Sequence, residues 1–222
     1  MRRTKEAAAQ TRAAIVEAGL ECFDRHGIAG TTLYDIAAEA GVTKGAVYHH
    51  FKGKRAILHE LREQFALPLL DAADTAMLRG DELPALERIE RFVVGVIDEL
   101  ERDPRKCRVL SVMLFKCEYV GDLAEELAGA LRNSLRLIKS FEAAYCAARD
   151  EGRLADGMEP EIAALETMLF FSGLMRLWLL HGPRSALRRN ARAAVAAHVR
   201  SRGVTAPRPA RYGAFASSPR QS

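Results

Sequence analysis

The residues best suited to chemistry fall within one short stretch, from Thr43 to Lys54. Their hydroxyl, imidazole and ammonium groups can bond phosphate oxygens and the edges of bases. No Asp or Glu lies among residues 43–55, so the positive charge of this stretch is unopposed. With one threonine upstream, the candidate contacts to double-stranded DNA are Thr32, Thr43, Lys44, Gly45, Ala46, Tyr48, His49, His50 and Lys54.

Two short helices joined by a tight turn are predicted to position these groups. The sequence TLYDIAAEAGVTKGAVYHHF at residues 32–51 begins with apolar residues at helical spacing. Gly41 follows them, where a helix end most easily accepts a left-handed residue. Thr43 can then cap a second helix by accepting a hydrogen bond from an amide of its first turn. The pattern predicts a helix-turn-helix.

The second of these helices has two different faces. Val47 and Phe51 lie four residues apart and share the inner face. The small residues Gly45 and Ala46 let the backbone approach a phosphate or a base closely. The polar side chains left on the outer face are Lys44, Tyr48 and His49. Such a helix enters the DNA major groove, although a packed helical hairpin with a solvated basic end has the same pattern.

Catalytic and metal-binding patterns are missing from the sequence. It has no glycine-rich phosphate loop, no His-Glu-x-x-His and no repeated Glu-x-x-His. The four cysteines, at positions 22, 107, 117 and 146, are not spaced for a metal and are predicted to be buried thiols. A redox pair of Cys107 and Cys117 is the alternative. We therefore expect no enzyme, no cofactor and no metal.

The positive charge is concentrated at the C-terminal end. The chain of 222 residues has a net charge of +4, but nine arginines and no acidic residue follow Gly182, which leaves −5 for residues 1–181. Global basicity is thus weak support for DNA binding. The most apolar run, Met168–Leu180, contains Arg176 and is shorter than the ~20 residues that span a bilayer. With no signal peptide at the start, a cytoplasmic protein without membrane contact is expected.

The remaining sequence predicts only helices, so the fold class is all-α: a small three-helix domain followed by a larger helical one. Residues 1–53 are assigned to the DNA-binding domain, 54–201 to a ligand-binding and dimerisation domain, and 202–222 to a disordered tail. A helix over 54–78 should be kinked at Pro68. The further helices are expected at 83–102, 106–119, 123–149, 161–181 and 184–199, with a buried stripe in the third of these at Leu127, Leu131, Leu135, Ile138, Phe141 and Tyr145.

Three segments resemble a known family. RRTKEAAAQTRAAIVEAGLECFDRHGIAGTT together with TTLYDIAAEAGVTKGAVYHHFKGK is similar to the DNA-binding segment of the tetracycline-repressor (TetR/AcrR) family of transcriptional regulators. LFKCEYVGDL at 114–123 and SGLMRLWLLHGP at 172–183 resemble its multidrug-efflux repressors. The resemblance implies a homodimer formed by the last two helices. The apolar helix 161–181 and the alanine-rich helix 184–199 suit that role by composition as well.

The resemblance also implies a pocket for a small lipophilic effector. Methionine and aromatic side chains adapt to varied shapes, and four helices supply them. The candidate pocket residues are Phe92, Val96, Leu110, Leu114, Leu137, Phe141, Met168, Phe171, Met175 and Trp178, each of which could equally be ordinary core. The expected protein is a ligand-responsive repressor that binds an inverted-repeat operator as a dimer and controls an efflux pump. The alternative is a helical DNA-binding regulator with no small-molecule response.

Overall fold

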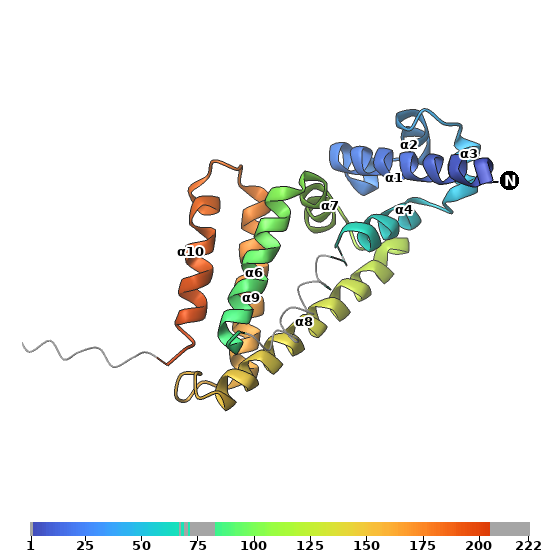
Figure 1. Ribbon diagram of the computed structural model, residues 1–222. Coiled ribbons are helices and arrows are strands. Elements are labelled where there is room, and N and C mark those ends of the chain that lie inside the picture. The colour runs from blue at the N-terminus through green and yellow to red at the C-terminus, as the bar shows by residue number, and fades with distance from the viewer. Residues whose placement is uncertain (1, 67, 69–70, 72–82, 205–222) are drawn as a thin grey trace, which may run out of the picture.

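The computed structural model describes residues 2–66, 68, 71 and 83–204. Within these residues the regular elements are helices, which confirms the all-α prediction, and Figure 1 shows a small N-terminal group of helices joined to a larger one. The segments outside the described residues include the later part of the predicted helix 54–78, apart from residues 68 and 71, and the tail from residue 205.

The N-terminal helices share one apolar core. They are α1 (Arg2–Gly30, with a left-handed break at Gly27), α2 (Leu33–Glu39), α3 (Lys44–His50) and α4 (Lys54–Leu61). The core contains Ile15, Leu20, Phe23, Ile36, Val47, Phe51, Ile57, Leu58 and Leu61, joined by Val109 and Val112 from the later helix α7. The packing of this unit therefore extends beyond residue 53, because α4 supplies three of its buried side chains.

The larger unit consists of α6 (Ala85–Arg102), α7 (Pro104–Phe115), α8 (Ala124–Asp150), α9 (Pro160–Leu180) and α10 (Ala186–Arg200). Helix α8 packs on α6 and α9, and α10 packs on the same two helices. In Figure 1, α8 runs as one long diagonal from the loop before α9 to a position beside α4. This helix, like α7, thus reaches from one unit to the other.

Two features of these helices differ from the sequence prediction. A π-helical turn, Arg62–Ala66, interrupts the helix after Leu61, before Pro68 is reached. The apolar side chains that α8 buries lie in its second half, such as Phe141 and Tyr145, whereas Leu127, Leu131 and Leu135 are exposed. The expected stripe was wrong for these three leucines because the first half of α8 extends past the core that covers the second half.

Among the described residues, one helix, α9, is long and apolar enough to cross a membrane. Core helices of globular domains can have the same length and composition. The inner face of α9 packs into the core through Ala163, Ala164, Phe171, Met175 and Trp178.

The four cysteines carry free thiols, and burial raises the pKa of Cys22, Cys107 and Cys117. Such thiols are mostly protonated at neutral pH and react slowly.

Candidate nucleic-acid interface

Reciprocal hydrogen bonds fix the start of α2. The Asp35 amide donates to Thr32 Oγ1 at 3.2 Å, and the Thr32 amide donates to Asp35 Oδ2 at 2.8 Å. The Thr32 hydroxyl also donates to Asp35 Oδ2 at 2.7 Å, and this bond first, then the one from the Thr32 amide, lowers the pKa of Asp35. Thr31 is buried instead, where its hydroxyl donates to the Gly27 carbonyl at 2.7 Å. Thr32 is therefore the cap of α2, at an exposed helix N-terminus.

The turn and the start of α3 follow the predicted geometry. Gly41 has φ 65°, in the left-handed region that favours glycine. The Ala46 amide donates to Thr43 Oγ1 at 3.2 Å, so Thr43 caps α3. At the other end the Phe51 amide donates to the Val47 carbonyl at 2.8 Å. Val47 and Phe51 are both buried, which fixes the face that α3 turns outward.

The outward face of α3 is polar and basic. Lys44, Tyr48 and His49 are exposed, and Lys44 Nζ lies 5.6 Å from the centre of the Tyr48 ring. Thr32, Thr43 and Gly45 are exposed as well, whereas Ala46 and His50 are half-buried. Eight of the nine candidate contacts thus lie on α3 or at the N-termini of α2 and α3, and six of them are exposed. A helix with this division of faces can place donors against phosphates and base edges.

The ninth candidate, Lys54, has a different environment. Its ammonium donates to the carbonyls of Ile28, at 2.6 Å, and Ala29, at 3.3 Å, at the end of α1. Those carbonyls lack helical partners, and the helix end carries a partial negative charge that favours a cation. Lys54 therefore ties α4 to the end of α1 and is half-buried, with two of its three ammonium donors used in these bonds.

Two residues near this surface are not among the candidate contacts. Arg12 of α1 stacks over the Phe51 ring, 4.3 Å from its centre, and pairs with Glu60 of α4 at 2.6 Å. It thereby braces the end of α3. Tyr34 of α2 is exposed beside Thr32. Contacts between residues 39 and 48 positions apart cannot be predicted from local spacing. The position of Tyr34, two residues after the capping threonine, could have suggested that Tyr34 is a surface residue.

The structure brings most of the candidate pocket residues together, but as packed core. Phe92, Val96, Leu137, Phe141, Phe171, Met175 and Trp178 are buried in one cluster, with Leu110 and Met168 half-buried against it. The Phe92 ring lies 5.5 Å from the rings of both Phe141 and Phe171. Leu114 is instead exposed. Within the described residues these side chains pack against one another as apolar core.

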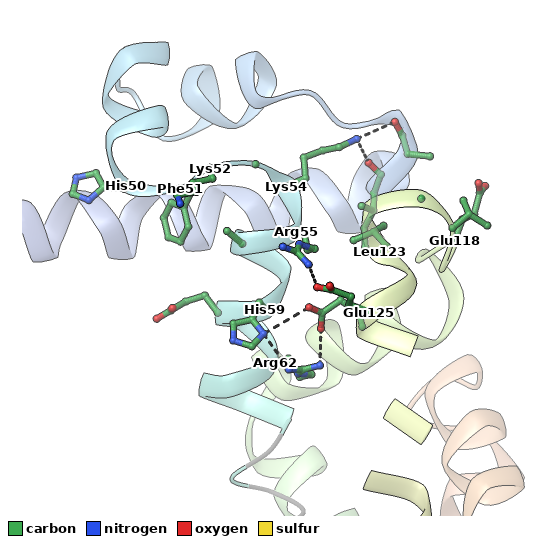
Figure 2. Close-up of a pocket in the computed structure, with 18 of the residues that line it drawn as sticks. His50, Phe51, Lys52, Lys54, Arg55, His59, Arg62, Glu118, Leu123 and Glu125 are labelled. Carbon is green, nitrogen blue, oxygen red and sulfur yellow. Dashed lines mark hydrogen bonds and ion pairs between the residues drawn. The ribbon is translucent and has the colours of Figure 1, made fainter. Parts of the chain in front are cut away.

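An open cleft of about 1200 Å³ lies at a different place, between the N-terminal helices and the start of α8. Figure 2 shows its charged lining, which includes His50, Lys52, Arg55 and Glu118. Several of these charges are paired across the cleft, among them Arg55 with Glu125 and Arg62 with Glu126. The cleft is thus the junction of the two units.

Comparisons with known proteins fit this arrangement. Residues 15–61 match the family described as bacterial regulatory proteins, tetR family, and residues 84–201 match the C-terminal region of MAATS-type transcriptional repressors. The HTH-type transcriptional regulator TtgR of Pseudomonas putida is 36% identical over 184 residues, which cover 81% of this chain and 85% of TtgR.

Solved structures show the same fold. NalD, the secondary repressor of the MexAB-OprM multidrug efflux pump in Pseudomonas aeruginosa, superposes with a TM-score of 0.78 at 27% identity, covering 89% of this chain and 98% of NalD. The SmeT–triclosan complex has a TM-score of 0.73 at 27% identity and covers 90% of this chain and 98% of the SmeT chain. SmeT is the repressor of the Stenotrophomonas maltophilia pump SmeDEF.

Proposed function

This chain belongs to the tetR family of bacterial regulatory proteins, and on that premise we propose that it is a cytoplasmic, effector-responsive repressor of an efflux operon. The family consists of DNA-binding regulators and not of enzymes. In the proposed mechanism a homodimer binds an inverted-repeat operator and blocks transcription. A small lipophilic effector then favours a shape of the dimer that does not fit the operator.

The observation that carries the proposal is the outward face of α3. Lys44 supplies a charge to phosphate, Tyr48 a hydroxyl, and His49 a ring nitrogen that can reach a base edge. Thr32 and Thr43 stand at exposed helix N-termini, whose free amides attract phosphate oxygens. Phosphate contacts of this kind fix the position of the helix, and base contacts select the sequence.

A homodimer is supported by an exposed apolar face on α9. Ile162, Leu165, Leu169, Leu177 and Leu180 are large, apolar and exposed. The neighbouring α10 exposes Ala193, Ala194 and Ala197, whose small side chains allow a second helix to approach closely. Four helices from two subunits would cover this surface. The two α3 helices would then read half-sites about 34–36 Å apart, one turn of B-DNA.

The effector is proposed to enter the apolar cluster around Phe92, Phe141 and Phe171. SmeT, which has the same fold, has been solved in complex with triclosan, a small lipophilic compound. A molecule that binds there can release DNA only if it binds the operator-incompatible shape more tightly. The close packing of the cluster favours one alternative, a DNA-binding regulator with no small-molecule response.

One experiment separates these functions. The purified protein is titrated onto labelled DNA from upstream of its own gene, and binding is followed by fluorescence anisotropy with and without triclosan, hydrophobic cations and flavonoid-like compounds. Saturable, salt-sensitive binding that one of these compounds reverses supports the proposal. Binding that no compound reverses supports the alternative, and failure to bind any upstream DNA contradicts both.

A further inference from the structure

A nearly buried ion pair joins the two units at the cleft. Arg62 Nη1 lies 2.6 Å from Glu126 Oε2, and the two side chains are only 13% and 10% exposed. Arg62 begins the π-helical turn that follows α4, and Glu126 belongs to the first turn of α8. The neighbouring pair Arg55–Glu125 spans the same junction, but its side chains are 46% and 80% exposed. Only the first pair is shielded from water.

The backbone of α8 is shaped to accept the guanidinium group. Gly129 faces Arg62, and a Cβ atom at this position would lie 2.6 Å from Arg62 Nη1. Real atoms do not approach so closely, so any larger residue would displace the arginine. Position 129 therefore lets the Arg62 side chain lie directly against α8.

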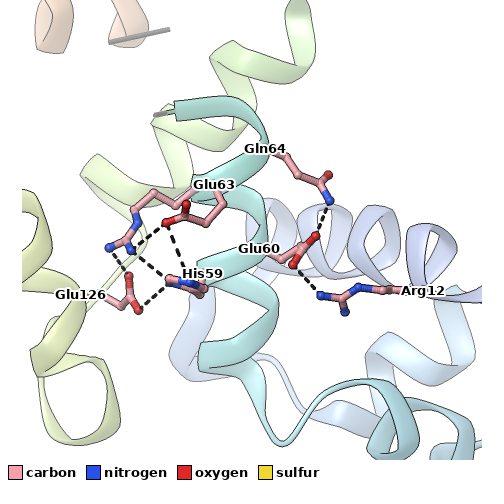
Figure 3. Close-up of polar contacts among 7 residues, drawn as sticks. Arg12, His59, Glu60, Glu63, Gln64 and Glu126 are labelled. Carbon is pink, nitrogen blue, oxygen red and sulfur yellow. Dashed lines mark hydrogen bonds and ion pairs between the residues drawn. The ribbon is translucent and has the colours of Figure 1, made fainter. Parts of the chain in front are cut away.

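Other charged groups complete the cluster, as Figure 3 shows. Arg62 Nη2 lies 3.2 Å from Glu63 Oε1 and 3.0 Å from His59 Nδ1. His59 Nδ1 is 3.7 Å from Glu126 Oε1. Burial of its own side chain raises the pKa of Tyr119 to about 12, and Glu126 is among the smaller contributions. Arg62 and Glu126 are less exposed than His59 and Glu63, so their charges interact more strongly with each other than with solvent-exposed neighbours.

Helix α8 connects this pair to the apolar cluster. It has 27 residues, and at 1.5 Å per residue it is about 40 Å long. Its first turn carries Glu126, while its second half places Leu137, Phe141 and Tyr145 in the core beside Phe92 and Phe171. A displacement of the core end would therefore move Glu126 against Arg62. The π-helical turn beside α4 is of a kind that is frequent at functional sites.

We propose that Arg62 and Glu126 form a latch through which α8 transmits the state of the effector site to the DNA-binding helices. This inference rests on the proposed function, since it concerns how the effector releases the operator. The latch holds α4 to α8, so the DNA-binding helices follow the movement of α8. Without it, effector and operator still bind, but neither changes the affinity of the other as strongly.

The test uses the full-length protein and triclosan as the effector probe. The main variant is Arg62→Met/Glu126→Met, because replacing both partners of a buried pair by apolar residues is often neutral for stability. Gly129→Ala displaces the arginine and keeps both charges. Arg55→Gln is the matched control, because it breaks the exposed pair at the same junction. Hydrogen exchange of α6 and α9 verifies that each variant is folded.

The quantity measured is the ratio of operator Kd with saturating triclosan to operator Kd without it. Coupling between sites is typically about 5–150-fold, and we expect the double variant and Gly129→Ala to reduce the wild-type ratio at least about fivefold. We also expect α4 to exchange at least about tenfold faster in the double variant, as local opening becomes easier. Arg55→Gln should leave both quantities within about twofold of wild type.

The outcomes are distinguishable. A folded double variant that keeps the wild-type ratio overturns the latch and leaves the proposed function intact. A reduced ratio in Arg55→Gln equal to that of the double variant also overturns it, because any ion pair at the junction would then suffice. A wild-type protein that binds the operator but is not released by triclosan contradicts both the effector response to this probe and the latch.

Discussion

Lys44 and Lys54 have the same charge and lie ten residues apart, but their surroundings give them different roles. Lys44 is exposed at the start of α3, with the Tyr48 ring nearby. Lys54 is bonded to the carbonyls at the end of α1. A lysine that already satisfies its donors releases fewer counterions when DNA binds, so charge alone does not identify a DNA contact.

Replacing Lys44 by alanine is therefore expected to weaken operator binding about tenfold and to reduce the salt slope of log K by about one for each subunit. The loss should be similar for operator and unrelated DNA, because a phosphate contact does not read sequence. Titrations at several salt concentrations measure both quantities. Lys139→Ala, on the exposed surface of α8, is the control. Unchanged affinity and slope for Lys44→Ala would refute the docking of α3.

His198 links three helices through a short chain of hydrogen bonds. Its Nε2 lies 2.9 Å from Thr167 Oγ1, which lies 2.7 Å from the Tyr145 hydroxyl. The Phe170 ring stacks on the imidazole at 4.0 Å. Burial, with a smaller effect of Arg202, lowers the pKa of His198 from 6.5 to about 4. The folded protein therefore holds this histidine neutral at pH values where an unfolded chain would protonate it.

This difference predicts a pH-dependent stability. Between pH 6.5 and about 4 the unfolded state binds a proton at His198 that the folded state does not, so stability falls as pH falls through this window. Below that window the loss is constant. Thermal unfolding at pH 7, 6 and 5 should show a decrease that is smaller by a few degrees in His198→Gln than in wild type. His181→Gln, at an exposed position, is the control. Equal decreases in wild type and His198→Gln would contradict the prediction.

At the scale of elements, contacts between helices decide whether a glycine inside a helix is required for packing. Gly19 of α1 faces α4, and a Cβ atom there would lie 2.6 Å from Ile57 Cγ2. Gly95 of α6 has no atom within 4 Å of the corresponding position. Both occur inside helices, where glycine costs conformational entropy. The first is required for close packing of two helices, and the second is not.

The two glycines should therefore respond oppositely to the same change. Gly19→Ala is expected to reduce the free energy of unfolding by about 1–3 kcal/mol through overpacking. Gly95→Ala should raise it by about 0.5–1 kcal/mol, because alanine is the better helix former. Chemical denaturation of both variants measures the difference. A destabilisation of Gly95→Ala as large as that of Gly19→Ala would show that helix contacts are not the cause.

At the scale of the whole molecule, dimerisation is the property on which operator binding depends. The exposed face of α9 presents Leu169 with 65% of its surface accessible, beside the small residues of α10. An apolar face of this extent is unfavourable in water unless another surface covers it. Two DNA-binding units held at a fixed distance can then contact both half-sites at once.

Leu169→Glu is expected to convert the dimer to monomer at micromolar concentration, because it buries a charge in the proposed interface. Operator affinity should fall at least about a hundredfold as the second half-site is lost. Leu135→Glu is the matched control, since Leu135 is equally exposed, at 64%, but lies on α8. Sedimentation or light scattering gives the mass. A wild-type monomer, or a Leu169→Glu dimer, would contradict the proposed assembly.

The local architecture could be predicted because its causes are local. Capping by Thr43, the left-handed turn at Gly41 and the inner position of Val47 depend on residues within one helical turn, and the structure has all three. The early end of α4 at Leu61 was missed, as was the exposure of Leu131, because both depend on how distant helices pack. The same holds for the partners of Lys54.

The sequence by itself determined the all-α class, the helix-turn-helix and the outward side chains of α3, since periodicity and caps specify them within a few residues. Only the tertiary structure decided that Lys54 binds carbonyls at the end of α1, that the aromatic residues pack in one cluster and that Arg62 is nearly buried against Glu126. Those facts join residues that are far apart in the chain, 64 positions in the case of Arg62 and Glu126, and no local pattern encodes which distant side chain will occupy a given space.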